Sequence, residues 1–153
     1  MNEANGNKAI QIFTIGYSGK NARKFFGLLK QAGIKRLFDV RLYNTSQLAG
    51  YTKRGDIEYF LESIVDADYV HLPIMAPTKW LLNDYKKGVI GWDEYEKQFK
   101  EIITARQIEK HLELDDLNMG CFLCAESTAD NCHRRLVAEY FKSHLPNISI
   151  KHL

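Results

Sequence analysis

The fold of this chain is indicated most clearly by the sequence MGCFLC at residues 119–124 and by the two segments directly after it. This apolar run has the length and composition of a buried strand, which we expect to extend over residues 119–125. The polar sequence ESTADN at residues 126–131 comes next, and residues 134–145 then have the spacing of an amphipathic helix. In a strand, loop and helix start of this kind, unpaired backbone N–H groups can face an anion.

Strands and helices alternate along the rest of the chain as well. Further strands are predicted at residues 9–15, 34–40, 69–73 and 148–152. Helices are predicted up to Gly33, from an N-cap at Asp56, and at residues 78–86 and 92–111, with a turn at residues 115–118. This order predicts the α/β class, as a three-layer Rossmann-like sandwich with a mostly parallel sheet of about five strands and helices on both faces.

The composition is that of a soluble globular protein. The 153 residues are 45% hydrophobic and 26% charged, and the formal net charge of +2 is too small for bulk attraction to nucleic acid. We expect a flexible tail at residues 1–8 and one domain over residues 9–153. No stretch has the length of a membrane span or the character of a signal peptide, and the three cysteines lack a secretory context, so the expected location is the cytoplasm.

Polar side chains lie at or just beyond the carboxyl ends of four of the predicted strands. They are Tyr17 and Ser18, then Arg41, then His71, and finally Glu126 with Cys132, His133 and Arg134. Because ligands of parallel sheets bind beyond the carboxyl ends of the strands, we expect these residues to meet around one polar site.

Cys132 is the candidate nucleophile of this site. It precedes a predicted helix and has His133, Arg134 and Arg135 beside it, which favours a thiolate. The alternative is a thiol packed under the loop with His133 capping it. A phosphatase-type loop does not fit, because neither Cys124 nor Cys132 is followed by an arginine six positions later.

The other candidates also have structural alternatives. Arg41 holds an anion or pairs with Asp39 or Glu126, and Ser18 is more simply a helix cap than a nucleophile. His71 is a general base or a buried, hydrogen-bonded histidine, while Glu126 orients an imidazole, pairs with an arginine or accepts a proton. Of the adjacent Arg134 and Arg135, one is expected to face the site.

Metals and cofactors are not expected from the sequence. Cys121 and Cys124 together with Cys132 and His133 offer zinc ligands, but an odd separation on a strand places Cys121 and Cys124 on opposite faces. A structural zinc site therefore stays an alternative. The glycines at 16 and 19 lack the third glycine of a dinucleotide fingerprint.

A region rich in aromatic and basic residues lies between Trp80 and Lys97. It could stack on bases and contact phosphates, or simply consist of amphipathic helices with solvated lysines. A nucleic-acid or nucleotide binding module is the second functional hypothesis.

Four short motifs together give a resemblance to a known family. They are TIGYS at residues 14–18, DVR at 39–41, CAE at 124–126 and CHR at 132–134, with Tyr69, His71 and Pro73 matching the middle. The chain resembles the domain of unknown function 488 family from about Phe13 to about Phe141. It differs at Tyr17, where histidine is common, and at Met75-Ala76, where Leu-Gly is usual.

The resemblance implies a compact α/β fold and a shared polar site rather than a particular substrate. The leading hypothesis is an enzyme-like domain that binds a small ligand carrying a phosphate or another anionic group. Arg41 and Arg134 would hold the charge with Ser18 and Tyr17, His133 or His71 would transfer a proton, and Glu126 would orient one of them.

Overall fold

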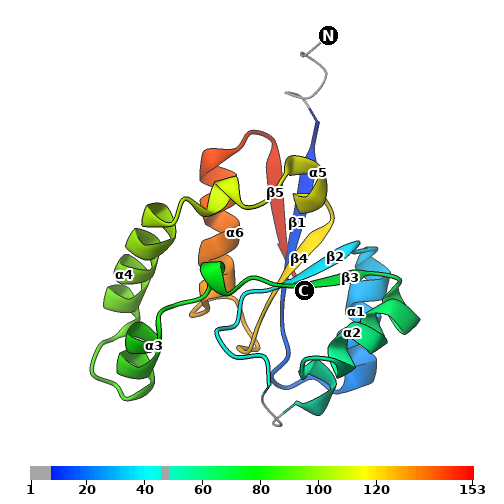
Figure 1. Ribbon diagram of the computed structural model, residues 1–153, viewed down its shortest axis with the longest axis horizontal. Helices are drawn as coiled ribbons and strands as arrows, with labels where there is room; N and C mark the ends of the chain where they lie inside the picture. The colour runs from blue at the N-terminus through cyan, green and yellow to red at the C-terminus, as the bar shows by residue number, and fades with distance from the viewer. Residues whose placement is uncertain (1–7, 46–48) are drawn as a thin grey trace.

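The computed structural model describes residues 8–45 and 49–153 of the protein, so residues 1–7 of the predicted tail lie outside it. The strands are β1 (Ile10–Gly16), β2 (Arg36–Asp39), β3 (Asp68–His71), β4 (Gly120–Cys124) and β5 (Ile148–His152). They form one sheet in the order β3-β2-β4-β1-β5, and every pairing is parallel (Figure 1). The predicted α/β class and the five-stranded parallel sheet are confirmed.

The helices lie on both faces of this sheet. They are α1 (Ala22–Ala32), α2 (Asp56–Phe60), α3 (Lys79–Lys86), α4 (Trp92–Ala105), α5 (Leu114–Leu117) and α6 (His133–His144). A π-helical turn, Leu61–Val65, continues α2, and 3-10 turns occupy Gly50–Thr52, Pro73–Met75 and Ile108–Lys110. None of the helices described is long and apolar enough to cross a membrane.

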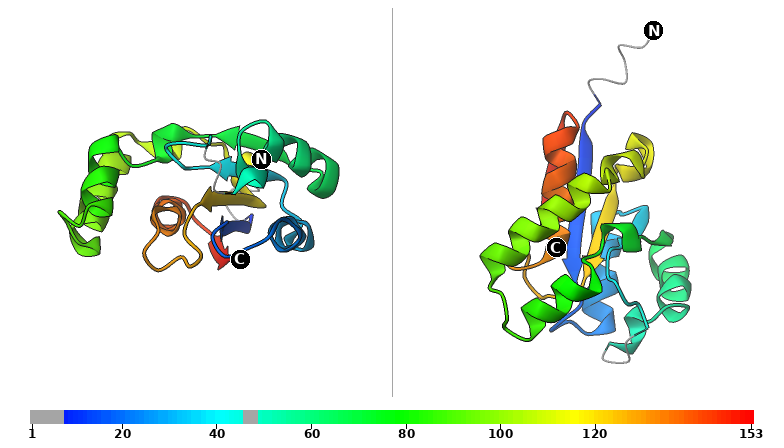
Figure 2. Two further views of the ribbon diagram at one scale, coloured as in Figure 1. Left: turned by 90° about the horizontal axis from the view of Figure 1, so that it is seen from below. Right: turned by 60° about the vertical axis from the view of Figure 1, so that its left-hand side comes forward.

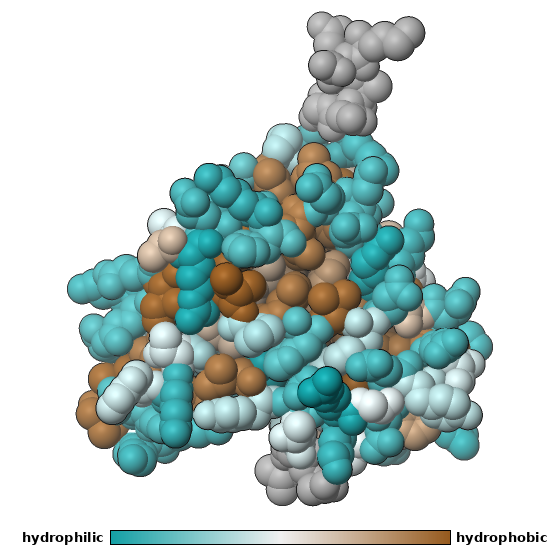
Figure 3. Space-filling view, viewed as in Figure 1, coloured by the Kyte–Doolittle hydropathy of each residue, from teal (hydrophilic) through white to brown (hydrophobic). Residues whose placement is uncertain are grey.

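Two apolar clusters fill the spaces between the layers. Alternate residues of a strand point to opposite faces, so neighbours in β4 enter different clusters. Phe122 packs with α4 and α6, whereas Cys121 and Leu123 pack with α1 and α2. Helices α3 and α4 lie side by side at one end of the molecule, outside α6 (Figure 2). Figure 3 shows apolar patches among hydrophilic side chains over this end.

Three helix boundaries differ from the predictions. The N-cap of α2 is Gly55 and not Asp56, which is the first helical residue. The predicted helix at residues 92–111 is shorter, because Gln107 takes a left-handed backbone conformation after α4. Residues 115–118, predicted as a turn, lie mostly in the single-turn helix α5.

Ser18 does not cap α1, so that prediction is wrong. The N-cap is Asn21, whose side-chain oxygen accepts a hydrogen bond from the backbone N–H of Lys24 at 2.8 Å. This is the usual capping geometry, in which the side chain satisfies an N–H of the first turn. Ser18 lies three residues earlier, where its own N–H donates to the carbonyl of Ala125 at 2.9 Å.

Candidate functional site

A cavity of about 270 Å³ lies beyond the carboxyl ends of β1, β2 and β4. Its walls come from the residues that follow these strands, from the first residue of α6, and from aromatic side chains of α3 and α4. Five of the predicted site residues line it, namely Tyr17, Arg41, Glu126, Cys132 and His133. The parallel sheet therefore brings separate segments of the chain to one opening, as its topology predicts.

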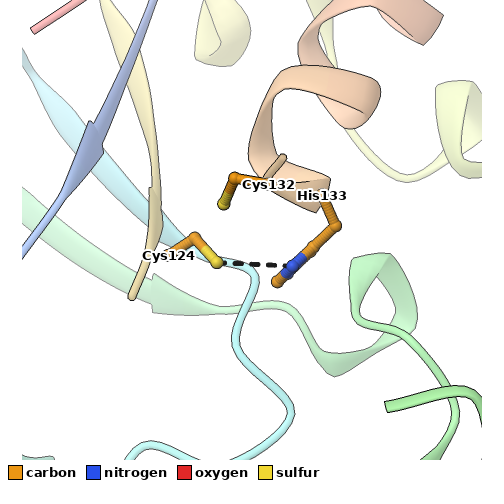
Figure 4. A group of neighbouring side chains, drawn as sticks. All are labelled: Cys124, Cys132 and His133. Carbon is orange, nitrogen blue, oxygen red and sulfur yellow. Dashed lines mark hydrogen bonds between the residues drawn. The ribbon is translucent and has the colours of Figure 1, made fainter. Parts of the chain in front are cut away.

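A cysteine and a histidine are in contact at this cavity. The Sγ atom of Cys124, at the end of β4, lies 3.3 Å from Nδ1 of His133, the first residue of α6 (Figure 4). On the other side of the ring, Nε2 donates to the carbonyl oxygen of Val40 at 2.7 Å. Since a carbonyl only accepts, Nε2 carries the proton, and Nδ1 is free to accept one from the thiol. An arrangement of this kind can serve as a nucleophile, a base, and a group that orients the base.

The surroundings of Cys124 favour its thiolate. Burial acts to raise the pKa of Cys124, but a hydrogen bond from Cys132 and the backbone N–H groups of Ala125 and Glu126 outweigh it. The positive charge of Arg134 adds to the same effect, so the pKa of Cys124 is lowered. A lowered pKa increases the thiolate fraction, which is the reactive form.

Cys132 has the opposite character. Its hydrogen bond to Cys124, followed by burial, raises the pKa of Cys132. Of the two thiols, Cys124 is the one whose Sγ atom contacts the His133 imidazole. The sequence indicated Cys132 as a candidate nucleophile, whereas the thiol in contact with His133 is that of Cys124.

The same atoms are potential metal ligands. Sγ of Cys124, Sγ of Cys132 and Nδ1 of His133 all lie within 4.8 Å of one another. Two sulfurs and one imidazole nitrogen form a ligand set that zinc accepts. Cys121 takes no part, because it is fully buried on the other face of β4.

The guanidinium group of Arg41 is largely committed to protein partners. It donates to both carboxylate oxygens of Asp39, at 2.9 and 2.7 Å, and to the side chain and carbonyl of Thr52. Arg41 and Asp39 are only 5% and 0% exposed. The ion pair, one of the two alternatives for Arg41, is thus present, and one N–H of the guanidinium has no hydrogen-bond partner among the residues that the structure describes.

Arg134 is a structural connection at the edge of the site. Its side chain is 1% exposed, and it donates to the carbonyl oxygen of Glu126 at 2.6 Å and to Thr14 Oγ1 at 3.3 Å. Gly16 makes this contact possible, since a Cβ atom there would lie 1.5 Å from the carbonyl oxygen of Glu126. Arg134 does not line the cavity, although its charge acts on Cys124.

The remaining predicted residues divide between the cavity and its surroundings. Glu126 is exposed and lines the cavity, while Tyr17 lines it with its ring 5.5 Å from the Arg41 guanidinium. His71 lies outside the lining, and its Nε2 donates to the carbonyl oxygen of Arg41 at 2.8 Å. Ser18 also lies outside it. The hydrogen bond of the structural alternative for His71 is therefore present, although His71 is half-buried rather than buried.

Three aromatic side chains predicted for a nucleic-acid surface form a wall of the cavity. Tyr85, Trp92 and Tyr95 lie in mutual ring contact, with centroids 4.9 to 5.8 Å apart, and all three line the cavity. Trp80, in contrast, is 82% exposed on α3. The aromatic residues are consequently divided between an internal wall and a single surface ring.

Cys124 was not a predicted site residue, because its position in an apolar run indicated a core side chain. The available signal was the separation of seven residues between Cys124 and the Cys132-His133 pair, which spans one loop between a strand end and a helix start.

Comparison with known proteins gives a match to a family model. No curated protein and no solved structure is significantly similar to the chain. The family model for the domain of unknown function DUF488 matches residues 21–141, which include Cys124, Cys132 and His133. Since this match covers most of the sequence, and the DVR, CAE and CHR motifs fall within it, the chain belongs to the DUF488 family.

Proposed function

We propose that this protein is an enzyme that uses Cys124 as its nucleophile and His133 as its general base. The observation that carries the proposal is the 3.3 Å contact between Cys124 Sγ and His133 Nδ1 at a cavity, with Nε2 held by the carbonyl of Val40. Cysteine nucleophiles are commonly activated by an adjacent histidine whose ring is oriented by a third group.

The proton path depends on the tautomer. Nδ1 of His133 accepts the proton of the Cys124 thiol, while the Nε2 proton stays on the hydrogen bond to Val40. The sulfur then attacks an electrophilic centre of the substrate, and the imidazolium returns its proton to the leaving group. The buried hydrogen bond to Val40 keeps the ring from rotating during this exchange.

The substrate that suits the cavity is small and partly flat. A volume of about 270 Å³ and the wall of Tyr85, Trp92 and Tyr95 favour an aromatic or conjugated group. Arg41, through the N–H that has no partner among the described residues, and Lys86 in the lining favour an anionic group at the same time. The proposal therefore keeps an anionic ligand. Arg41 and Tyr17 would contact it, whereas Arg134 and Ser18 would not.

The test is the rate at which iodoacetamide alkylates each cysteine, located by peptide mass spectrometry. Cys124 is expected to react at pH 7 faster than a model thiol, and Cys121 is expected to stay unmodified in the folded protein because it is fully buried. Cys124→Ser should remove the fast reaction. A Cys124 that reacts no faster than a model thiol would contradict the proposal.

Zinc binding is a second candidate, and the three ligand atoms within 4.8 Å support it. It predicts about one equivalent of zinc in protein purified without chelator and its loss in Cys132→Ser. Protein without bound zinc that also fails to take up added zinc would exclude this candidate.

Nucleic-acid binding and a cytoplasmic location remain predictions. The first requires an affinity for oligonucleotides that falls steeply with salt, and the exposed Trp80 is the ring that would stack on a base. The second agrees with the three free cysteines.

A further inference from the structure

Two thiols lie close together at the cavity, which bears on how the site would be oxidised. The sulfur atoms of Cys124 and Cys132 lie within 4.8 Å of each other, and both cysteines are free and buried. We propose that a hydroperoxide entering the cavity oxidises Cys124, and that Cys132 then closes a reversible intramolecular disulfide with it. The inference rests on the proposed function, because the same sulfur is the first to react.

The positions of the two cysteines in the fold allow this bond. Cys124 ends β4, Cys132 immediately precedes α6, and the loop of residues 125–131 joins them. In Figure 4 both sulfur atoms point into the space between the strand end and the helix start. A disulfide needs the sulfurs about 2.05 Å apart, so they must move closer. The loop that would adjust lies outside the helices and strands, so the sheet keeps its pairing.

The third cysteine cannot compete for either partner. Cys121 is fully buried on the opposite face of β4, where it packs with the α1 and α2 side of the core. Burial raises the pKa of the Cys121 thiol, so it stays protonated. The molecule thus contains one pair of adjacent thiols and one isolated thiol among its three cysteines.

The chemistry balances with a hydroperoxide as the oxidant. The Cys124 thiolate attacks the terminal peroxide oxygen, so that an S–O bond forms, the O–O bond breaks, and the alkoxide takes a proton from His133. The thiol of Cys132 then attacks the sulfenic sulfur; the S–S bond forms, the S–O bond breaks, and hydroxide leaves with the Cys132 proton as water. Two thiols and one hydroperoxide give one disulfide, one alcohol and one water.

The neighbouring Cys132 would protect the nucleophile. A sulfenic acid that meets no thiol proceeds to irreversible sulfinic acid under excess peroxide. Capture by Cys132 instead stores the oxidised site as a disulfide that a small thiol reductant can open. This assigns Cys132 a role that differs from that of nucleophile and that depends on its sulfur lying within 4.8 Å of the Cys124 sulfur.

The experiment treats the reduced, chelator-washed full chain with hydrogen peroxide and maps the products by mass spectrometry. The expected product is a peptide pair linked through Cys124 and Cys132, with Cys121 still a thiol. Cys132→Ser should instead accumulate a dimedone-reactive sulfenic acid at Cys124, and Cys124→Ser should yield no disulfide. Cys121→Ala is the control variant and should form the same linkage as the wild type.

The outcomes separate this inference from the proposed function. If iodoacetamide alkylates Cys124 rapidly but peroxide yields only sulfinic acid or links between chains, the inference is wrong and the nucleophile stands. A Cys124 that is slow towards both reagents removes the nucleophile and the inference together. Mapping of the wild-type chain needs no variant, so a failure of any variant to fold leaves the test decisive.

Discussion

The imidazole of His133 is bonded through Nε2 to the carbonyl oxygen of Val40, a residue 93 positions earlier, at 2.7 Å. Val40 directly follows β2, whereas His133 opens α6 after β4. Because β2 and β4 are neighbours in the sheet, the end of one strand fixes the base that serves the end of the other. The orientation of His133 is therefore a product of the sheet topology.

Replacing this histidine should slow the reaction of Cys124. In His133→Gln the amide can still donate to Val40, but it cannot accept the thiol proton as a base. We expect the alkylation rate of Cys124 at pH 7 to fall by about 100-fold or more, and the pH at which the rate reaches half its maximum to rise. Stopped-time alkylation with mass spectrometric readout between pH 5 and 9 measures both.

His71→Gln is the matched control for this variant. His71 also donates from Nε2 to a backbone carbonyl, that of Arg41 at 2.8 Å, yet it does not line the cavity. Its replacement should leave the Cys124 rate within about twofold of wild type. Equal losses of the Cys124 alkylation rate in both variants would mean that replacing His133 acts through the structure rather than through a lost base.

The buried pair of Arg41 and Asp39 should be important for stability. Arg41→Met would leave the fully buried Asp39 carboxylate without its cation, a loss expected to cost about 3–5 kcal/mol. Urea unfolding followed by circular dichroism gives this free energy. Lys100→Met, which breaks the exposed Lys100–Glu96 pair, should cost less than about 1 kcal/mol. Similar losses of unfolding free energy in the two variants would contradict the conclusion that burial makes the Arg41–Asp39 pair costly to break.

Much of the architecture could be predicted because the signals for it are local. Apolar runs such as residues 119–125 and the helical spacing of residues 134–145 depend on side chains close in sequence, and both segments have the predicted type. The helix boundaries were less accessible. The left-handed backbone of Gln107 and the capping by Asn21 depend on conformations that no apolar periodicity encodes.

The site was only partly predictable for a different reason. Strand order brings Tyr17, Arg41 and His133 to one cavity, and the motif positions at strand ends were sufficient to anticipate this. The sequence did not show which of these side chains are held by protein partners. Arg41 is bound to Thr52, and Arg134 is bound to the carbonyl of Glu126. The reactive position of Cys124 depends on its contact with His133, which appears only when β4 and α6 are placed in space.

Gly16 should be essential where the β1 end meets the loop after β4. A Cβ at this position would lie 1.5 Å from the carbonyl oxygen of Glu126, and 2.8 Å from a guanidinium nitrogen of Arg134. Since backbone has to move, Gly16→Ala is expected to destabilise the protein by at least about 1–3 kcal/mol. Thermal and urea unfolding measure the loss.

Gly27 offers the opposite case within the same chain. It lies inside α1, and a Cβ there would meet no atom within 4 Å. Gly27→Ala should therefore stabilise the protein by about 0.5–1 kcal/mol through helix propensity. If the Gly16→Ala variant were as stable as the wild type, this result would contradict the close approach of the loop after β4 to the end of β1.

Stability should fall as the pH drops through the titration of His152. This residue of β5 contacts the hydroxyl of Thr14 through Nδ1 at 2.6 Å, and Arg134 donates to the same hydroxyl. Partial burial of this mostly exposed ring, and then the charge of Arg134, lower the pKa of His152 below its ordinary value of 6.5. The unfolded chain therefore binds the proton more readily than the folded chain. The stability that the neutral His152 contributes is complete above about pH 6.5 and is lost as the pH falls through the lower folded-state pKa.

Urea unfolding of the wild type and of His152→Gln at a series of pH values from about 7.5 to 5 should show a difference in unfolding free energy that narrows on acidification. A difference that stays constant, or that widens, would rule out His152 as the group responsible.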